Sequence, residues 1–558
     1  MTGRFCLVLH GHLPWVLHHG RWPHGEDWLF EAASETWLPL LEVAMTARAE
    51  GLPLQWSLGL TPILLEQLSS DRFKEGFVVY LQELVDRAQV DAASFTEAGD
   101  LHLAWLADRH VARLEGQLAR FGELDGDLVA PWVELQDQGL VELLSSNATH
   151  GYHPLILHDA CARAQVRAGL ATSQRHFGRR PSSVWLPECA YRPPGPWTPP
   201  AVHGDVRERA GVASLFAQEG VTAFVVDTHL IRGADPVATL EGGIALPVAP
   251  GQADWDHQRA WRSELEPHRV VEDGEVLPLS VLARCPDVSE QVWSGEIGYP
   301  GDGRYLEFHK RHGQRGLRYW KVTGSEVDLG EKDRYYPADV DGAVHTHSLH
   351  FVETVKTRLR RHLERTGRQG VVCAPFDAEL FGHWWHEGPD FLLGVARALA
   401  ADDEVEAVTL GAVAAAPPDK AVRLPEGSWG AGGDHQVWNN DELRFYWEMA
   451  FRAEDRFLDA WHRHDWANRA DLAELLVEAG RQLLLLQASD WPFVISTGGA
   501  VDYGIRRIAG HAQAVDDLLN GAEDLAAGRP CDPVTTNTVE RCRLVDAVFP
   551  NLSLEWWA

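Results

Sequence analysis

Several features are scarce in this sequence of 558 residues, and each scarcity excludes a class of protein. The seven cysteines are spread along the chain and never stand in CxxC spacing, which argues against a disulfide framework and a zinc ribbon. No uninterrupted apolar run approaches the roughly 20 residues that cross a bilayer. The N-terminal stretch MTGRFCLVLHGHLPW lacks the pattern of a secretory signal. We therefore expect a cytoplasmic protein.

Basic residues are also scarce: 50 Lys and Arg stand against 81 Asp and Glu, a formal net charge of −31. A surface of this sign repels phosphate backbones and anionic lipid, so nucleic acid and membrane partners are disfavoured, whereas a neutral ligand is not. Tryptophan, in contrast, is plentiful, with 23 residues against 10 tyrosines. Because indole faces stack on sugar rings while the N–H binds hydroxyls, this composition favours a carbohydrate ligand. Core packing accounts for about half of these positions.

Short apolar runs rich in β-branched residues alternate with longer segments of helical character. The alternation predicts an α/β fold whose parallel sheet is buried on both faces. Nearly every run is followed by a residue able to do chemistry, which is typical of barrels, where the active site lies at the carboxyl ends of the strands. The runs are 5–9, 54–60, 141–145, 184–186, 223–226, 277–283 and 371–375, with 405–410 a candidate for an eighth.

The longer interruptions of this alternation indicate the domain organisation. Insertions at about residues 187–215 and 287–340 lie on the face of the barrel where substrate clefts are built. A Pro/Gly-rich stretch at 416–435 marks a domain boundary, and beyond it leucines recur at three- and four-residue steps, as in amphipathic helices. We therefore expect a catalytic barrel over residues 1–415 and a helical domain over residues 416–558 that contributes to the cleft.

Two carboxylates stand directly after predicted core strands: Glu188 in WLPECAY and Asp377 in APFDAELFGHWWHEGP. Because all strands of a parallel barrel end at one mouth, these side chains should converge. A retaining glycosidase needs such a pair, one carboxylate to attack the anomeric carbon and one carboxyl group to protonate the leaving oxygen, about 5–5.5 Å apart. For Asp377 taken alone, a helix N-cap is the competing interpretation.

A metal site is the alternative from another class. His10 and His12 in HGHLP stand at i and i+2, and His150, Asp227 or His229 could complete a zinc ligand set. This interpretation, a metal-dependent barrel hydrolase, leaves the two carboxylate motifs without a role. Neutral histidines at a barrel mouth also suit hydrogen bonds to sugar hydroxyls.

Five motifs stand in order along nearly the whole chain: HGHLPW, SNATHGY, WLPECAY, PFDAELFGHWW and QASDWPF. They resemble the signature regions of glycoside hydrolase family 57, and their detail is similar to the 1,4-α-glucan branching enzymes of that family. The resemblance extends to WPHGEDWLFEA, QVWSGEIGYPG and LPEGSWGAGGDHQVW.

The resemblance implies a (β/α)7 barrel with an inserted domain and a C-terminal α-helical domain, and no metal or organic cofactor. It implies that Glu188 is the nucleophile and Asp377 the acid/base. The implied reaction cleaves an α-1,4-glucan, holds the glycan on Glu188 and transfers it to a 6-hydroxyl of an acceptor glucan, as in glycogen biosynthesis. The residues implied to bind the glucan or to line its cleft are Arg284, Gly301, Trp429, Asp490, His10, His12, Trp22, His150, Trp293 and Trp438.

Several of these positions also have a structural interpretation. Asp490 follows a predicted helix and could act as a cap. Arg284 could pair with Glu188 and lower its pKa, which would keep the carboxylate ionised. Trp384 and Trp385 are adjacent in the sequence, so we expect one of them to pack in the interior.

The chain departs from the family in one loop. Family branching enzymes carry a tyrosine over the active site on a mobile loop after the fifth strand, whereas no tyrosine stands here between Tyr191 and Tyr299. Leu240 stands about where it would be expected, with Trp255 and Trp261 the nearest aromatics. If that tyrosine excludes water, its absence favours hydrolysis. A mainly hydrolytic, α-amylase-like activity is therefore the alternative to branching.

Overall fold

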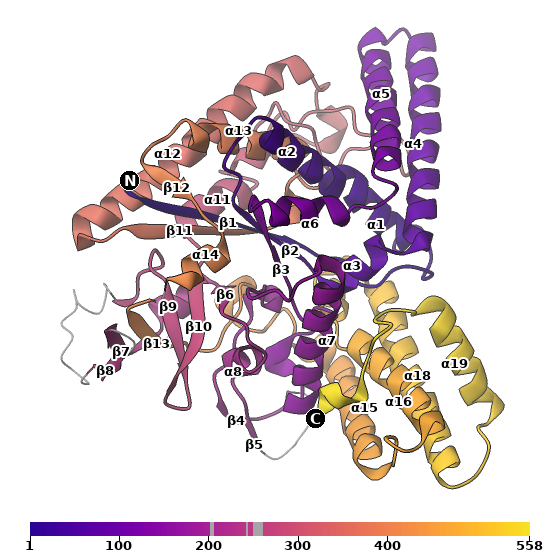
Figure 1. The fold of residues 1–558 in the computed structure, drawn as a ribbon. Coiled ribbons are helices and arrows are strands. Elements are labelled where there is room, and N and C mark those ends of the chain that lie inside the picture. The colour runs from indigo at the N-terminus through magenta and orange to yellow at the C-terminus, as the bar shows by residue number, and fades with distance from the viewer. Residues whose placement is uncertain (201–205, 242–243, 249–260, 417) are drawn as a thin grey trace.

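Seven parallel segments close into a barrel in the computed structural model, which describes residues 1–200, 206–241, 244–248, 261–416 and 418–558 (Figure 1). Single parallel bridges join the third segment to the fourth, the fourth to the fifth and the sixth to the seventh. The predicted (β/α)7 barrel is therefore confirmed. The ring consists of β1 (Gly3–Gly11), β2 (Trp56–Leu60), β3 (Val141–Leu144), the bridged segment 183–184, β6 (Ala223–Val226), β10 (Glu275–Ala283) and β11 (Gly370–Asp377).

The strand register sets which side chains reach the mouth of the barrel together. β1 pairs with β11 along its length, and His10 lies opposite Asp377 in this ladder. On its other side β1 pairs with β2, where His10 lies opposite Gly59. The last residues of these three strands therefore lie at one level, at the carboxyl end of the barrel.

The predicted strands at the fourth and eighth positions differ from the structure. The run 184–186 forms a single bridge, at Val184, because Pro187 offers no N–H to a ladder and Glu188 turns the chain with φ 58°. The run 405–410 contains β12 (Val405–Ala407), which pairs with the first residues of β1. β12 therefore lies outside the ring, at the amino end of the barrel.

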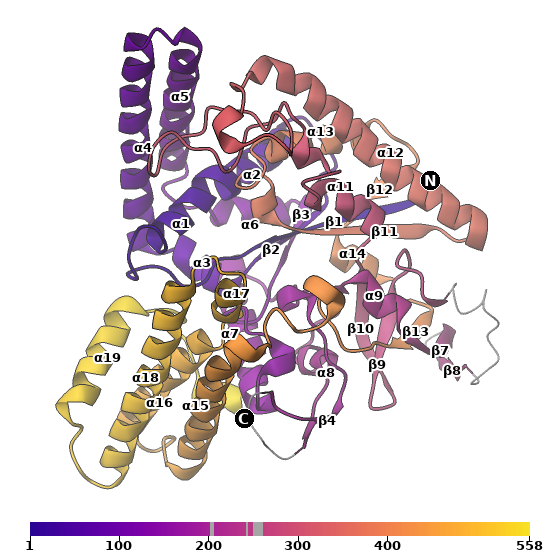
Figure 2. The same ribbon diagram turned by 180° about the vertical axis from the view of Figure 1, so that it is seen from behind.

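A side sheet extends from the barrel at β10. It adds β9 (His268–Glu272), β13 (Lys420–Arg423), β7 (Asp235–Glu241) and β8 (Ile244–Pro247) in that order, and β7 and β8 lie at the periphery in both views (Figures 1 and 2).

The structure places two of the residues named for the loop that lacks the family's tyrosine. Leu240 lies in β7 opposite Ala245 of β8. Trp261 is only 5% exposed and belongs to a buried cluster, so it is a core residue rather than a replacement for a lid aromatic. Trp255 lies outside the described residues.

The helices surround the ring, and one pair projects from it as a long hairpin that the sequence pattern did not single out (Figure 1). This hairpin consists of α4 (Asp71–Glu97) and α5 (Leu101–Glu123). No helix in the described ranges is both long and apolar enough to cross a bilayer. The other helices of this part are α1 (Glu26–Ala32), α2 (Leu38–Ala49), α3 (Pro62–Leu68), α6 (Ala130–Asp137), α7 (Asp159–Phe177), α8 (Val212–Ala217), α9 (Thr228–Arg232), α11 (Pro286–Trp293), α12 (Val340–Thr366), α13 (Gly388–Ala400) and α14 (Leu410–Ala415).

In the residues that the structure describes, the two expected insertions contain little regular structure. The first, 187–215, holds the short antiparallel pair β4 (Gly195–Trp197) and β5 (Arg207–Arg209). The second, 287–340, contains most of α11 and then mainly turns and isolated bridges.

The C-terminal segment is helical, and its helices gather beside α7 (Figure 2). The leucines predicted to recur on one helix face all lie in α16 and are buried there. The first of these helices begins at Arg444, so the boundary at residue 416 stays a prediction. The helices are α15 (Arg444–Arg463), α16 (Ala470–Leu486), α17 (Asp490–Ser496), α18 (Val501–Ala526) and α19 (Pro533–Val545).

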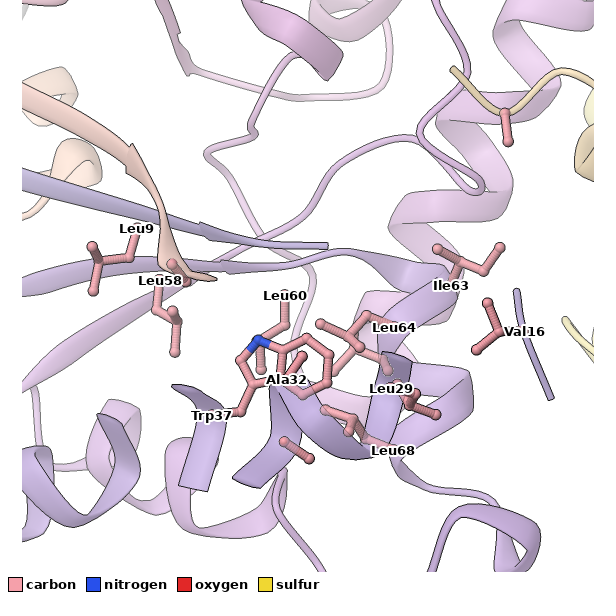
Figure 3. Close-up of a cluster of buried hydrophobic side chains, with 14 of the residues drawn as sticks. Leu9, Val16, Leu29, Ala32, Trp37, Leu58, Leu60, Ile63, Leu64 and Leu68 are labelled. Carbon is pink, nitrogen blue, oxygen red and sulfur yellow. The ribbon is translucent and has the colours of Figure 1, made fainter. Parts of the chain in front are cut away.

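A cluster of buried apolar side chains fixes the ends of β1 and β2 beneath the mouth (Figure 3). Leu9, Leu58 and Leu60 project from these strands and are at most 2% exposed. Each such side chain contributes about 1.5–3 kcal/mol of hydrophobic stabilisation when buried. Because α3 and the segment around Trp37 supply the facing side chains, the cluster also holds the loops that follow both strands.

Candidate active site

Glu188 is held in an uncommon backbone conformation at the mouth of the barrel. Its φ of 58° and ψ of 24° lie in the left-handed region, which costs a non-glycine residue about 1–2 kcal/mol. The segment around Trp429 stabilises it twice: the Trp429 backbone N–H donates to the Glu188 carbonyl (3.1 Å), and its indole N–H donates to Oε2 (2.8 Å). The Ser489 hydroxyl donates to the other carboxylate oxygen at 3.4 Å. Strain and partners together fix where this carboxylate points.

Asp377 stands at the end of β11, close enough to Glu188 for the charge of Glu188 to raise the pKa of Asp377. Burial raises the pKa of Glu188 to about 7, although the Trp429 indole opposes this rise. Burial also raises the pKa of Asp377 well above its ordinary value, and the charges of Glu379 and Glu188 raise it further. Crowding therefore disfavours full ionisation and favours one protonated and one ionised carboxyl group near neutral pH.

Arg284 does not pair with Glu188, so that prediction is wrong. Its guanidinium donates to Asp227 Oδ2 at 2.5 Å. The predicted lowering of the pKa of Glu188 is wrong as well, because burial outweighs the stabilising contacts. Arg284, Asp227 and His229 line a hollow of about 630 Å³ that also borders Trp429.

Two neutral histidines pack within the site. The ring of His10 stacks on Trp185 with centroids 4.4 Å apart, and His10 Nε2 lies 3.0 Å from His150 Nε2. His150 Nδ1 in turn lies 2.8 Å from the Ser489 hydroxyl. Burial lowers the pKa of both histidines well below the ordinary value, so they stay neutral over the physiological pH range. With 2% and 3% exposure they form the floor of the site rather than its open wall.

His12 behaves differently because it contacts an acid from the C-terminal helices. Its Nδ1 lies 3.0 Å from the Thr61 hydroxyl, and its Nε2 lies 3.0 Å from Asp490 Oδ2. Burial alone would lower the pKa of His12, but the charge and hydrogen bond of Asp490 raise it above the ordinary value. Asp490 begins α17 without capping it through its side chain, so the helix-cap interpretation is wrong. The structure thus joins the loop after β1 to the helical segment at this pair.

The zinc ligand set considered from the sequence is assembled only in part. In the described part of the chain, His12, His150 and Asp490 each place a possible ligand atom within 4.8 Å of the other two. His10 does not belong to this group. Asp227 lies instead beside His229 and Arg284. Within the group, His12 and Asp490 already bond to each other, and His150 Nδ1 bonds to Ser489. The donor atoms are therefore occupied by internal hydrogen bonds.

Of the aromatic residues expected at the cleft, Trp429 and Trp293 lie together. Their ring centroids are 5.7 Å apart, and Trp293 is 37% exposed. Trp384 is 53% exposed and lines a hollow of about 530 Å³ with Gly301, while Trp385 is 2% exposed. The expectation that one tryptophan of this adjacent pair packs inside is confirmed. A side chain at Gly301 would meet the Gly295 carbonyl oxygen at 2.3 Å, so only glycine fits there.

Two other expected residues lie elsewhere. Trp438 is 1% exposed and stacks on Tyr152 with centroids 4.7 Å apart, so it lies behind the wall of the cleft and the expectation that it faces the glucan is corrected. Its burial follows from Tyr152 and Gly430, against which its ring packs closely. Trp22 is 49% exposed and borders a separate hollow of about 300 Å³ beside the α4–α5 hairpin.

Glu379 and Ser489 belong to the site but were missed from the sequence. Glu379 Oε1 accepts the backbone N–H of His12 (3.1 Å) and the indole N–H of Trp37 (3.0 Å), and burial raises its pKa to about 7. The available signal was a second acid two residues after Asp377 in FDAEL. Ser489 directly precedes Asp490 in the same motif, where a serine reads equally well as a helix cap.

A parallel barrel with two interacting carboxyl groups at the carboxyl ends of separate strands defines a barrel enzyme of the paired-carboxylate class. The model of glycosyl hydrolase family 57 matches residues 6–422, and the model of the 1,4-alpha-glucan branching enzyme C-terminal region matches residues 450–557. The chain belongs to glycosyl hydrolase family 57.

The similar proteins cover nearly the whole chain. The 1,4-alpha-glucan branching enzyme of Thermococcus kodakarensis is 37% identical over 523 residues, 93% of this chain and 74% of that protein. The crystal structure of a GH57-type branching enzyme from Pyrococcus horikoshii has a TM-score of 0.89 at 34% identity, covering 100% of this chain and 97% of that one. The alpha-amylase AmyC of Thermotoga maritima has a TM-score of 0.80 at 26% identity, covering 100% and 99%.

The pKa of Asp377 predicts how stability depends on pH. The unfolded chain loses this proton at about pH 4, whereas the folded chain keeps it to higher pH. Folding therefore loses stability as pH rises from about 4 through the raised pKa. We expect Asp377→Asn, which carries no titrating proton, to raise the midpoint of thermal unfolding at pH 8 and to raise it much less at pH 4.5. Calorimetry of the variant at both pH values checks this expectation.

The matched control is Asp403→Asn, which changes an exposed aspartate. Its unfolding midpoint should differ from that of the unmodified protein by the same small amount at both pH values. An equal gain for Asp377→Asn at pH 4.5 and pH 8 would contradict the raised pKa.

Proposed function

We propose that this protein is a 1,4-α-glucan branching enzyme that works by a retaining mechanism, with Glu188 as the nucleophile and Asp377 as the acid/base. The observation that carries the proposal is the pair of interacting buried carboxyl groups at the mouth of one barrel. The match of residues 450–557 to the branching-enzyme C-terminal model supports the choice of reaction.

In the first half of the reaction, a Glu188 oxygen attacks the anomeric carbon of an α-1,4-linked glucosyl residue. The bond from this carbon to the leaving oxygen breaks, and Asp377 gives its proton to that oxygen. The Trp429 indole stabilises the negative charge of Glu188 before the attack and orients the carboxylate. We infer a carboxyl separation of about 5–5.5 Å, as direct attack requires.

In the second half, the 6-hydroxyl of an acceptor glucan replaces the departed chain. Asp377, now ionised, takes the proton from this hydroxyl, and the hydroxyl oxygen forms the α-1,6 bond as the bond to Glu188 breaks. Burial of Asp377 suits both steps, because a carboxyl group with a raised pKa starts protonated and readily takes a proton back.

The remaining residues divide into groups that contact the sugar and groups that support them. We infer that Arg284, Gly301, Trp293, Trp429 and Trp22 contact the glucan along the hollows that they line. His12 and Asp490 then bind hydroxyls next to the reacting sugar, while His10, His150 and Trp438 support the floor and wall.

We also propose that the barrel ends near residue 415.

The inferred substrate and cellular role follow from the same features. The donor and the acceptor are both α-1,4-glucan, a neutral polymer that a surface of net charge −31 does not repel. We propose cytoplasmic glycogen biosynthesis as the setting, because branching makes a compact soluble glucan from linear chains.

Mainly hydrolytic activity is the second candidate. The likeness to the AmyC alpha-amylase favours it, as does the lack of tyrosine between Tyr191 and Tyr299. Leu240, which stands near the position expected for the tyrosine, lies in β7 and pairs with Ala245 of β8. If water rather than a sugar hydroxyl reaches the glycosyl-enzyme, the product is a free reducing end.

Incubation with amylose distinguishes these two outcomes. We expect proton NMR to show new α-1,6 anomeric signals, while a reducing-end assay shows few new ends, because transfer conserves the number of reducing ends. Reducing ends that accumulate without α-1,6 signals would reject branching in favour of the hydrolytic alternative.

Substitution of the two carboxyl groups tests their roles. We expect Glu188→Gln to lower kcat by several orders of magnitude, because an amide neither attacks nor leaves as a carboxylate does. Asp377→Asn should lower it by about 10²–10⁴-fold through loss of proton transfer. Glu406→Gln, at an exposed glutamate, is the control and should leave kcat unchanged. Near-normal turnover by either active-site variant would remove the role assigned to that residue.

A further inference from the structure

The bonded pair His12 and Asp490 stands on two segments that are remote in sequence. His12 lies in the loop after β1, and Asp490 is the first residue of α17. The bond at 3.0 Å lasts only if the two segments keep a fixed distance. A hydrogen bond weakens steeply with misalignment. A side chain that contacts both segments and fixes their relative position would therefore determine the strength of the bond between His12 and Asp490.

Arg507 of α18 contacts both segments within three residues of the pair. Its Nη1 donates to the carbonyl oxygen of Trp15 at 2.5 Å, three residues after His12. Its guanidinium carbon lies 4.7 Å above the ring of Trp491, the residue after Asp490. Arg507 is 5% exposed, so both contacts are shielded from water. One planar side chain thus links the loop after β1 to the start of α17.

The partners of Arg507 fix its own orientation. The same Nη1 lies 2.9 Å from the Tyr503 hydroxyl, and Nη2 lies 3.0 Å from His511 Nε2. His511 Nδ1 lies 2.7 Å from Gln482 Oε1 on α16. Burial lowers the pKa of His511 well below its ordinary value, so this partner is neutral. The hydrogen bonds that Arg507 makes to Trp15, Tyr503 and His511 therefore go to neutral groups and fix its orientation. Burial alone would raise the pKa of Asp546, but the charge of Arg507 adds to the hydrogen bond of His19 in lowering it.

The same network reaches a second anchor on the loop after β1. Gln482 Nε2 donates to Asp546 Oδ2 at 3.0 Å, and Asp546 Oδ1 lies 2.7 Å from His19 Nε2. The Trp15 indole also donates to the Val545 carbonyl oxygen at 2.8 Å. The loop is therefore held to the C-terminal segment at Trp15, whose carbonyl Arg507 binds, and again at His19.

We propose that Arg507 is a positioning residue, which holds Asp490 against His12 by fixing Trp15 and Trp491 relative to each other. The inference rests on the proposed function, because it gives Arg507 a role in positioning residues of the same active site. It gives the C-terminal helices a defined part in the reaction beyond supplying Asp490. A planar guanidinium is needed, since it stacks on an indole and donates to a carbonyl at once, which an ammonium group does poorly.

The test compares Arg507→Met and Arg507→Lys with Arg506→Met, which changes the neighbouring exposed arginine. We expect both Arg507 variants to lower kcat on amylose about tenfold or more with a smaller change in KM, and Arg506→Met to leave both unchanged. The titration of the His12 ring, followed by NMR, should move to lower pH in the Arg507 variants. The groups that face this ring are Asp490, Glu379, Glu188, Thr61, His10 and His150.

A double-mutant cycle with Asp490→Asn gives the sharpest result. If Arg507 acts through Asp490, the double variant is no slower than Asp490→Asn alone to within about twofold. The proposal would be overturned if the losses of kcat from the two single variants multiplied in the double variant, or if the pH at which His12 titrates did not change. Arg507 would then be a purely structural residue. If Arg507→Met does not fold, Arg507→Lys decides the question in the same cycle.

The outcome is separable from that of the proposed function. Bond cleavage is followed by the total of new reducing ends and new α-1,6 linkages, so the cycle is measurable whichever product dominates. An unmodified protein that only hydrolyses amylose would reject branching while leaving the role of Arg507 to be judged by the cycle.

Discussion

Burial of three carboxyl groups at one barrel mouth is the constraint on which the site depends. Glu188, Asp377 and Glu379 all have raised pKa values, and burial is the largest cause for each. The carboxylate charges of Glu188 and Glu379 are offset mainly by N–H donors, namely the Trp429 and Trp37 indoles and the His12 amide, rather than by arginine. Because buried carboxyl groups in one place disfavour full ionisation, the site favours a protonated group beside an ionised one, the pair that the proposed retaining reaction needs.

This constraint explains why the site is assembled from distant parts of the chain. The barrel supplies the acids and the neutral histidines, but the donors that stabilise Glu188 come from Trp429 and Ser489, beyond the last barrel strand. The C-terminal helices also supply Asp490, whose contact raises the pKa of His12. The helical segment therefore supplies charged and polar groups that the barrel mouth needs. The contacts of Arg507 with Trp15 and Trp491 keep Asp490 in place against His12.

The sequence was sufficient to predict the elements whose signals are local. Apolar runs followed by polar residues identified the barrel strands and placed Glu188 and Asp377 at strand ends, because both signals lie within a few residues. The partner of Arg284 could not be read in this way, since Asp227 and Glu188 both follow strands that end at the same mouth. Trp438 was misplaced because its burial depends on Tyr152, which is remote in sequence. Glu379 was missed because its role depends on the amide of His12 and the indole of Trp37.

The central claim is that Glu188 forms a covalent bond to the transferred glucan. The most direct test is to trap this intermediate with a fluorinated glucosyl fluoride, which forms the glycosyl-enzyme faster than it is released, and to map the modified peptide by mass spectrometry. We expect one added glycosyl group on the peptide that contains Glu188, and none in Glu188→Gln. Turnover of the reagent with modification of a different carboxylate, or with release of an inverted product, would contradict it.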